Sequence, residues 1–453
     1  MTEPSSRRPA PGTPRPYHFP DFTHRRLSSG LTVWVVPLPD RDLVSVQLLV
    51  DGGAAAESEP EGGIAALTVE TLVTGTRRLD GHAFAEATER LGIEISADSS
   101  WDLSRVGFSA LADRYRDGLA LLAEMVREPR FDEGEFDRMR EERLADILQA
   151  RSEPGRLAEE HFLRACFAAD SPYTRLSGGI PETVEPLRVE QARAHHDRHW
   201  RPDRAHLVVG GSVSEDEVLR DAEASLGDWT GESPGHRTIP TWDRGGRRIV
   251  IVDRPGSVQS ELRVGHVGIE RSHPDLFPAI VMAAVLGGTF SSRLNQRLRE
   301  ELGYTYGARA SFDPRRAAGP FAARAAVQTE VTADAVRETL ALIAGMQAAP
   351  PDEAELREVT DYLIGVFPLR FETTSGAAAG IEPIAVYGLA HDWWATYRAR
   401  IEAVGPAQVL DAAVNLLRPA EAVIVLAGDA ARVRPDLEKA DLGPIEVVRP
   451  AED

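Results

Sequence analysis

The chain has 453 residues, more than one globular domain usually holds, which excludes a single small module. Lysines and arginines total 51 against 71 aspartates and glutamates, and the formal net charge of −20 argues against nucleic acid and anionic membranes as partners. Hydrophobic residues make up 42% of the sequence, enough for extensive cores, so overall disorder is excluded as well.

The N-terminal segment, residues 1–21, contains six prolines and is predicted to be a disordered tail. Its two early arginines are followed by no apolar run, so it does not resemble a secretory signal. The most apolar later stretch, residues 279–286, is much shorter than the roughly 20 residues that span a bilayer. We therefore expect a cytoplasmic protein without a membrane partner. Cys166, the only cysteine, is expected to be a small buried apolar residue.

Two pairs of matching segments indicate an internal repeat. Residues 201–205 and 418–422 both begin with Arg-Pro, end with Ala and lead into an apolar, β-branched strand. Residues 91–102 and 302–313 both begin with Leu-Gly, where the glycine is expected to cap a helix, and continue as an alternating strand. Because the matches keep their order, the chain is predicted to hold two homologous halves.

We place the first half at residues 22–232 and the second at 246–447, joined by a Gly/Pro-rich linker at 233–245 and followed by a tail at 448–453. Each half begins with strands, continues with amphipathic helices and further strands, and closes with a strand and a helix. Strands grouped beside helices, without strict βαβ alternation, favour an α+β fold in which each half has a mainly antiparallel sheet backed by helices.

Residues 63–76, GIAALTVETLVTGT, resemble the zinc helix of the insulinase and pitrilysin-type metallopeptidases, the inverzincins. In that family H-x-x-E-H lies between a Gly-x-Ala start and a Gly-Thr end. The same register puts Ala66 and Glu70 at the two zinc-binding histidines and Val69 at the catalytic glutamate. Alanine and valine can neither ligate zinc nor activate its water, and a single glutamate on a helix is usually solvated or salt-bridged. The resemblance thus implies a degenerate metal site.

The third zinc ligand of the family is a glutamate on a later helix, shortly before a proline-containing turn. Here the resemblance puts Arg151 at this position, with Glu153 as the alternative in another register. Because a cation would oppose zinc, we expect the chain to bind no metal and to have no catalytic residues of its own.

A second group of candidate metal ligands lies near the end of the first half. His195 and His199 are four residues apart and would share a helical face. The resemblance places this segment at a helix end that serves packing in relatives. A structural or surface role is therefore favoured over metal binding.

Residues 287–308, GGTFSSRLNQRLREELGYTYGA, resemble the family's C-terminal signature, in which an arginine and a tyrosine seven residues apart approach the zinc site. The matching residues are Arg299 and Tyr306. A guanidinium offers fixed donors for substrate carbonyls or carboxylates, and a phenol can donate to a developing oxyanion. Arg297 and Tyr304 have the same spacing and are the alternative register. Without the flanking pattern, both pairs would be typical of a solvated helix end and a half-buried strand.

The resemblance extends over nearly the whole chain after the first 20 residues. Relatives occur as long single chains with four such units, or as pairs of two-unit chains in which one chain carries the zinc helix and the other contributes the arginine and tyrosine. This sequence resembles the second kind of chain. We therefore expect a non-catalytic subunit of a heterodimeric, cytoplasmic zinc peptidase, with zinc on the partner chain and peptides or unfolded segments as substrates.

Two other expectations follow from the sequence. The alternative function is a catalytically inactive peptide-binding or scaffold protein that forms homodimers. The net charge of −20 also suggests that any substrate cavity prefers basic peptides.

Overall fold

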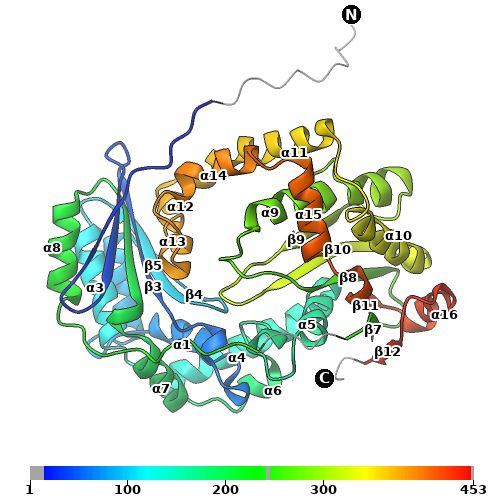
Figure 1. Cartoon of the computed structure of the whole chain (residues 1–453). Helices are drawn as coiled ribbons and strands as arrows, with labels where there is room; N and C mark the ends of the chain where they lie inside the picture. Colours follow the sequence, from blue (N-terminus) through cyan, green and yellow to red (C-terminus); the bar gives the residue numbers. More distant parts are fainter. Residues whose placement is uncertain (1–14, 241–244, 450–453) are drawn as a thin grey trace, which may run out of the picture.

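Two six-stranded sheets dominate the computed structural model, which describes residues 15–240 and 245–449. Their strand orders are β1-β2-β6-β3-β5-β4 and β12-β7-β11-β8-β10-β9, so each sheet belongs to one half of the chain. Most neighbouring strands are antiparallel, and helices pack against both sheets (Figure 1). The predicted α+β fold with two homologous halves is therefore confirmed.

The first half supplies β1 (Thr23–Arg26), β2 (Thr32–Pro37), β3 (Leu43–Val50), β4 (Ile95–Ser99), β5 (Ser104–Leu111) and β6 (Ala205–Gly211). Its helices are α1 (Ile64–Leu72), α2 (Gly81–Leu91), α3 (Tyr115–Arg127), α4 (Glu133–Ser152), α5 (Pro154–Cys166), α6 (Pro181–Val184), α7 (Val189–His199) and α8 (Glu215–Leu226). Helices α3 and α8 pack against β5 and β2, while α1 packs against α4 and α7.

The second half supplies β7 (Arg248–Asp253), β8 (Gln259–Val267), β9 (Ala308–Phe312), β10 (Pro320–Gln328), β11 (Val423–Gly428) and β12 (Ile445–Val448). Its helices are α9 (Leu276–Ala283), α10 (Thr332–Gly345), α11 (Glu353–Val366), α12 (Thr374–Ala379), α13 (Glu382–Tyr387), α14 (Trp393–Glu402), α15 (Pro406–Leu416) and α16 (Ala430–Ala440). Two π-helical segments, Ala284–Gly288 and Asn295–Glu301, lie between α9 and β9.

The segments that revealed the repeat have the same local structure in both halves. Gly92 and Gly303 both have φ of +65°, a left-handed conformation that glycine adopts readily at the end of a helix. The two Arg-Pro segments form short helical turns just before β6 and β11. These strands then run parallel to β2 and β7, respectively.

The halves are held together by an exchange of helices. Helix α5, from the first half, packs on β7, β8 and β11 of the second sheet, and α12, from the second half, packs on β3 and β6 of the first (Figure 1). Strand β2 shows the consequence: Val33 and Val35 face the first-half core, while Trp34 and Val36 contact the core of the second half. A β-branched run suits a strand that is buried on both faces.

The same exchange brings charged groups together. Glu382 of α13 accepts a hydrogen bond from Arg105 of β5 at 2.9 Å. In the other direction, Glu159 of α5 accepts from Arg263 of β8 at 2.9 Å and from Arg324 of β10 at 3.2–3.3 Å. Each sheet therefore receives a glutamate from the opposite half.

The prediction of a disordered tail over residues 1–21 is wrong from residue 15 onward; residues 1–14 lie outside the described part of the chain. Phe19 is only 8% exposed, and its ring lies 4.9 Å from that of Phe371 and 6.3 Å from that of Trp394, between centroids. The aromatic side chains dock this segment on the second half.

The other predicted boundaries can be placed relative to the helices and strands. The linker at 233–245, of which residues 241–244 lie outside the described part, falls between the end of α8 and the start of β7. The sequence predicts a C-terminal tail at 448–453, whereas Val448 is the last residue of β12.

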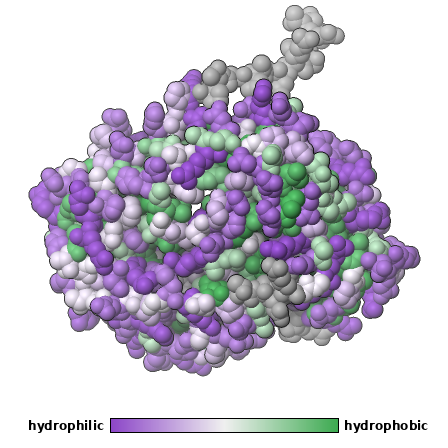
Figure 2. Space-filling view, viewed as in Figure 1, coloured by the Kyte–Doolittle hydropathy of each residue, from purple (hydrophilic) through white to green (hydrophobic). Residues whose placement is uncertain are grey.

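The molecular surface reflects the composition. Figure 2 shows a face on which hydrophilic residues predominate and apolar residues are scattered among them. Among the helices of residues 15–240 and 245–449, none combines the length and the apolarity that a bilayer crossing requires.

Docking of the N-terminal segment predicts a stability effect. The Phe19→Ala variant is expected to lower the free energy of unfolding by about 3 kcal/mol, because a buried aromatic ring is removed and its site cannot fully collapse. Denaturant unfolding followed by tryptophan fluorescence measures the change. Asp21→Ala, at an exposed position two residues away, is the control and is expected to stay within about 0.5 kcal/mol of the original chain. Equal stability of both variants would contradict the docking.

Candidate functional site

Helix α1, which resembles the zinc helix, is built into the first-half core. Ala66 and Val69 are 4% and 1% exposed. The helix is fixed at its start by Glu57, whose carboxylate accepts hydrogen bonds from the backbone N–H groups of Gly63 at 3.0 Å and Ala65 at 2.9 Å. Burial raises the pKa of Glu57 to about 7, although these donors and Arg175 act in the opposite direction. The apolar side chains and the capped start make α1 a packing element.

Glu70, the remaining polar residue among the three degenerate positions, is half-buried and forms an ion pair with Arg143 of α4. The Nε atom of Arg143 lies 3.3 Å from a Glu70 carboxylate oxygen. A carboxylate that is neutralised by a guanidinium is a poor ligand for a cation. The sequence pattern gave no sign of this pair, since Arg143 is remote from α1 along the chain.

Arg151, predicted at the third ligand position, lies near the C-terminal end of α4 and donates two hydrogen bonds to Glu160 of α5, at 2.7 and 3.0 Å. Glu153, the alternative, stands at the junction of α4 and α5. The cation that contacts Glu70 is Arg143, two helical turns before Arg151. The correspondence of Arg151 to the family's third ligand stays a prediction.

These donor groups do not fit a zinc ion. Zinc requires imidazole, thiolate or carboxylate ligands that converge on one point, whereas α1 offers two apolar side chains and one ion-paired carboxylate. Within residues 15–240 and 245–449, no group of three or more His, Cys, Asp or Glu side chains is arranged to hold a metal ion.

The histidines of α7 have structural partners. His195 is hydrogen-bonded through Nε2 to the carbonyl of Gly52 at 3.1 Å, and its neighbour His196 to the carbonyl of Val126 at 2.8 Å. Burial lowers the pKa of His195 to about 3 and that of His199 to about 4, so both are neutral at pH 7. Cys166 is fully buried, as expected, and burial raises its thiol pKa to about 12.

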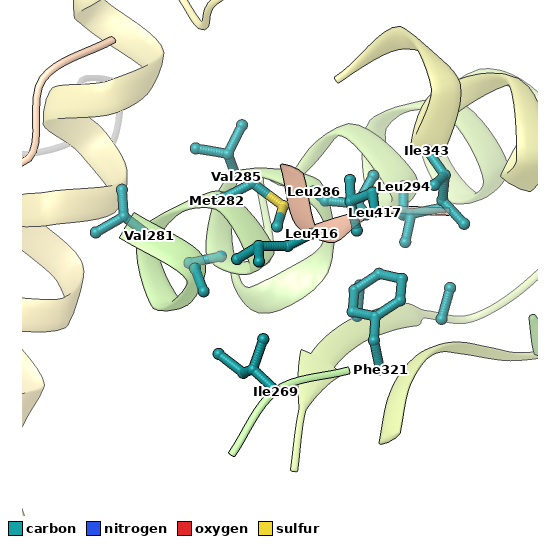
Figure 3. Close-up of a cluster of buried hydrophobic side chains, with 14 of the residues drawn as sticks. Ile269, Val281, Met282, Val285, Leu286, Leu294, Phe321, Ile343, Leu416 and Leu417 are labelled. Atoms are coloured by element: carbon teal, nitrogen blue, oxygen red, sulfur yellow. The ribbon is translucent and has the colours of Figure 1, made fainter. Parts of the chain in front are cut away.

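The C-terminal signature is anchored in the second-half core. Leu286 and Leu294 point into this core beside Phe321 (Figure 3). A Cβ atom on Gly287 would lie 2.3 Å from the backbone nitrogen of Ala310, so only glycine allows the helical segment to approach β9 this closely. Gly287 therefore serves backbone packing.

Asn295, which sequence reasoning missed, ties the signature to the edge strand. Its side-chain oxygen accepts a hydrogen bond from the backbone N–H of Ala308 at 2.8 Å, and its amide nitrogen donates to the carbonyl of Thr289 at 2.9 Å. These two bonds fix the segment between the helical turns and β9.

Arg299 and Tyr306 line one pocket of about 750 Å³ at this end of the sheet. The Arg299 guanidinium carbon lies 4.1 Å from the centre of the Phe290 ring, a cation–π contact that orients it. Tyr306 is 92% exposed and Phe290 67% exposed, so both aromatic rings present large apolar surfaces to solvent.

The alternative register is engaged elsewhere. Arg297 donates to Glu338 at 2.8 Å and to Glu301 at 2.7 Å, and these two carboxylates raise its pKa. Tyr304 packs against the second-half core. The pair that shares the pocket is therefore Arg299 and Tyr306.

Known protein families match the two parts of the chain separately. Residues 33–176 match the family model described as insulinase (peptidase family M16), and residues 186–363 match the model described as the peptidase M16 inactive domain.

Two curated relatives and one crystal structure illustrate the similarity. The chain is 25% identical to an uncharacterized zinc protease of Rickettsia bellii, over 63% of this chain and 68% of that protein. It is 24% identical to the non-peptidase homolog YmxG of Helicobacter pylori, over 73% of this chain and 76% of that protein. The fold matches the crystal structure of a peptidase M16 inactive domain from Pseudomonas fluorescens with a TM-score of 0.84 and 23% identity, covering 90% of this chain and 98% of that one.

Restoring the three motif residues is expected not to restore metal binding. In the combined variant Ala66→His, Val69→Glu and Glu70→His, a carboxylate would be buried at a position that is now 1% exposed, and Arg143 would remain beside the new ligands without its partner. Metal analysis of the purified variant should find no stoichiometric zinc, and Glu70→His alone serves as the control for loss of the ion pair. One chelator-sensitive zinc per chain would contradict this account.

Proposed function

We propose that this chain, which belongs to the insulinase family (peptidase family M16) and is an inactive homologue of its peptidases, acts as the non-catalytic subunit of a heterodimeric zinc metallopeptidase. One observation carries the proposal. The chain has lost the zinc ligands and the base on α1, yet Arg299 and Tyr306 share an open pocket. Groups that bind substrate in a chain without zinc ligands can serve peptide hydrolysis if another chain supplies the zinc and the base.

The proposed partner is a homologous chain with an intact H-x-x-E-H helix. Zinc bound there supplies the Lewis acid and the activated water for peptide hydrolysis. This chain contributes positioning and charge stabilisation: the guanidinium of Arg299 offers planar donors to a peptide carbonyl, and the phenol of Tyr306 can donate to the developing oxyanion. The proposed substrates are peptides or unfolded segments, and the proposed compartment is the cytoplasm.

The exposure of the aromatic residues supports a shared site. Phe290 and Tyr306 are far more exposed than large aromatic side chains usually are on a protein surface. Binding of a peptide, or closure of the pocket by a second chain, would remove this apolar surface from water. The cation–π contact with Phe290 also holds Arg299 in place before any ligand arrives.

The second candidate function is a catalytically inactive peptide-binding or scaffold homodimer. The name of the Helicobacter pylori relative, a non-peptidase homolog, favours it. In this case the pocket would hold peptides without any hydrolysis.

Affinity capture separates the two functions. The tagged chain, recovered from its source cells, is expected to bring with it an equimolar chain that carries H-x-x-E-H, and the eluate is expected to cleave peptides in a chelator-sensitive manner. Sizing and protein identification give the stoichiometry. Recovery of the tagged chain alone or as a homodimer, with no peptide cleavage, would favour the scaffold.

Single substitutions test the roles of the pocket residues within the reconstituted pair. Arg299→Ala and Tyr306→Phe are each expected to reduce turnover on the order of 10²-fold without preventing assembly, since each removes one donor to the reacting carbonyl. Arg297→Ala is the matched control, because this arginine lies on the same helical segment as Arg299 but is engaged by Glu301 and by Glu338 of α10. Unchanged turnover in both test variants would show that these residues have no role in the reaction.

A further inference from the structure

Three arginines stand in a row across the second sheet. Arg263 of β8 lies directly opposite Arg324 of β10, which in turn lies directly opposite Arg309 of β9. Residues directly opposite on neighbouring strands share one face of a sheet, and like charges in that position destabilise it. The row therefore requires compensating negative charge.

The compensation reaches only two of the three arginines. Glu159 of α5 accepts hydrogen bonds from Arg263 and Arg324, and Glu261 accepts from Arg263 at 3.1 Å. Arg309 is exposed at the edge of the sheet. Among the described residues, none with a carboxylate is paired with it.

The first half provides an internal comparison. Asp98 of β4 and Arg309 of β9 occupy the same place in the two copies of the repeated segment. Asp98 lies opposite Arg105 of β5 and forms an ion pair with it at 2.8 Å. Both Arg105 and Arg324 also receive a glutamate from the opposite half. The two edges thus have the same construction, with the charge of one residue reversed.

Arg309, whose charge is opposite to that of Asp98, lies in the pocket that Arg299 and Tyr306 line. Arg309, three residues beyond Tyr306, lines the same pocket as Arg299. The charged residues of the lining are four arginines and one glutamate, in a chain whose net charge is −20. This lining favours an acidic ligand, in contrast to the sequence-based expectation of a preference for basic peptides.

We propose that this pocket is a carboxylate-binding subsite, in which Arg309 binds an acidic side chain or the terminal carboxylate of an extended peptide beside Arg299 and Tyr306. A guanidinium with no protein carboxylate can form a bidentate pair with a ligand carboxylate. The exposed Phe290 and Tyr306 rings would contact the apolar part of the peptide. The proposal deepens the proposed function by naming its substrate class, but it concerns binding by this chain alone.

The test uses fluorescein-labelled peptides and the full chain without a partner. Three peptides share one extended sequence and differ in one feature: a central Glu with an amidated C-terminus, a central Gln with an amidated C-terminus, and a central Gln with a free C-terminal carboxylate. Fluorescence anisotropy at physiological salt is expected to show that at least one carboxylate peptide binds about tenfold or more tightly than the neutral one. The tighter of the two identifies the carboxylate source.

The variant R309D discriminates a binding role from a structural one. It places the acidic residue of the first-half edge opposite Arg324, so thermal stability is expected to be maintained while the preference for carboxylate peptides is lost. R41D is the matched control: Arg41 is exposed, lies outside the pocket lining and undergoes the same change of charge. Its preference is expected to equal that of the original chain.

Two outcomes would overturn the proposal. Equal binding of all three peptides by the original chain would show that the pocket does not select carboxylates. Retention of the preference in R309D, or its loss in R41D, would assign the preference to another site or to overall charge. Because no zinc, partner or hydrolysis is involved, these outcomes are independent of the capture experiment.

Discussion

The exchange of one helical region between the halves is the constraint on which the rest of the structure depends. Helix α5 covers β7, β8 and β11, and α12 covers β3 and β6. Each sheet is therefore covered in part by a helix from the other half. Apolar packing supplies most of the driving force, and Glu159 and Glu382 add one charge each at equivalent places. Glu159 of α5 reaches Arg324 on β10, whereas Arg309 is exposed on β9, so the arginine row and the pocket are open at this last strand.

Helix α1 serves packing in this molecule. Val69 lies in the first-half core, where complete burial of such a side chain contributes about 1.5–3 kcal/mol. The buried Glu57 caps the helix start, and Arg143 neutralises the Glu70 carboxylate. A helix that holds a metal must instead present polar ligands toward an open site, so packing and metal binding compete for the same side chains.

The features that could be predicted from the sequence are those with local causes. Gly92 and Gly303 marked helix ends because a left-handed residue favours glycine. The flanking pattern favoured Arg299 and Tyr306, which line one pocket, but their role in binding stays a prediction. Contacts between distant segments could not be predicted: the docking of Phe19 on Phe371, and the pairing of Arg143 with Glu70, depend on tertiary placement alone. Arg309 is an intermediate case, since aligning the two copies of the repeat against each other would have revealed its opposite charge to Asp98.

The charge distribution implies that selection in the pocket operates at contact distance. The net charge of −20 repels an acidic peptide at long range, but at physiological ionic strength this repulsion is screened beyond about 8 Å. Inside the pocket, Arg309 and Arg299 act at hydrogen-bond distance, where screening is much weaker. An acidic peptide would therefore gain little from electrostatic steering and much from a slow dissociation, because the charge pairs form only after the peptide has reached β9. Both halves have the same edge construction. At β4, Asp98 pairs with Arg105 of its own sheet, whereas at β9 the opposite charge of Arg309 is left for a ligand carboxylate.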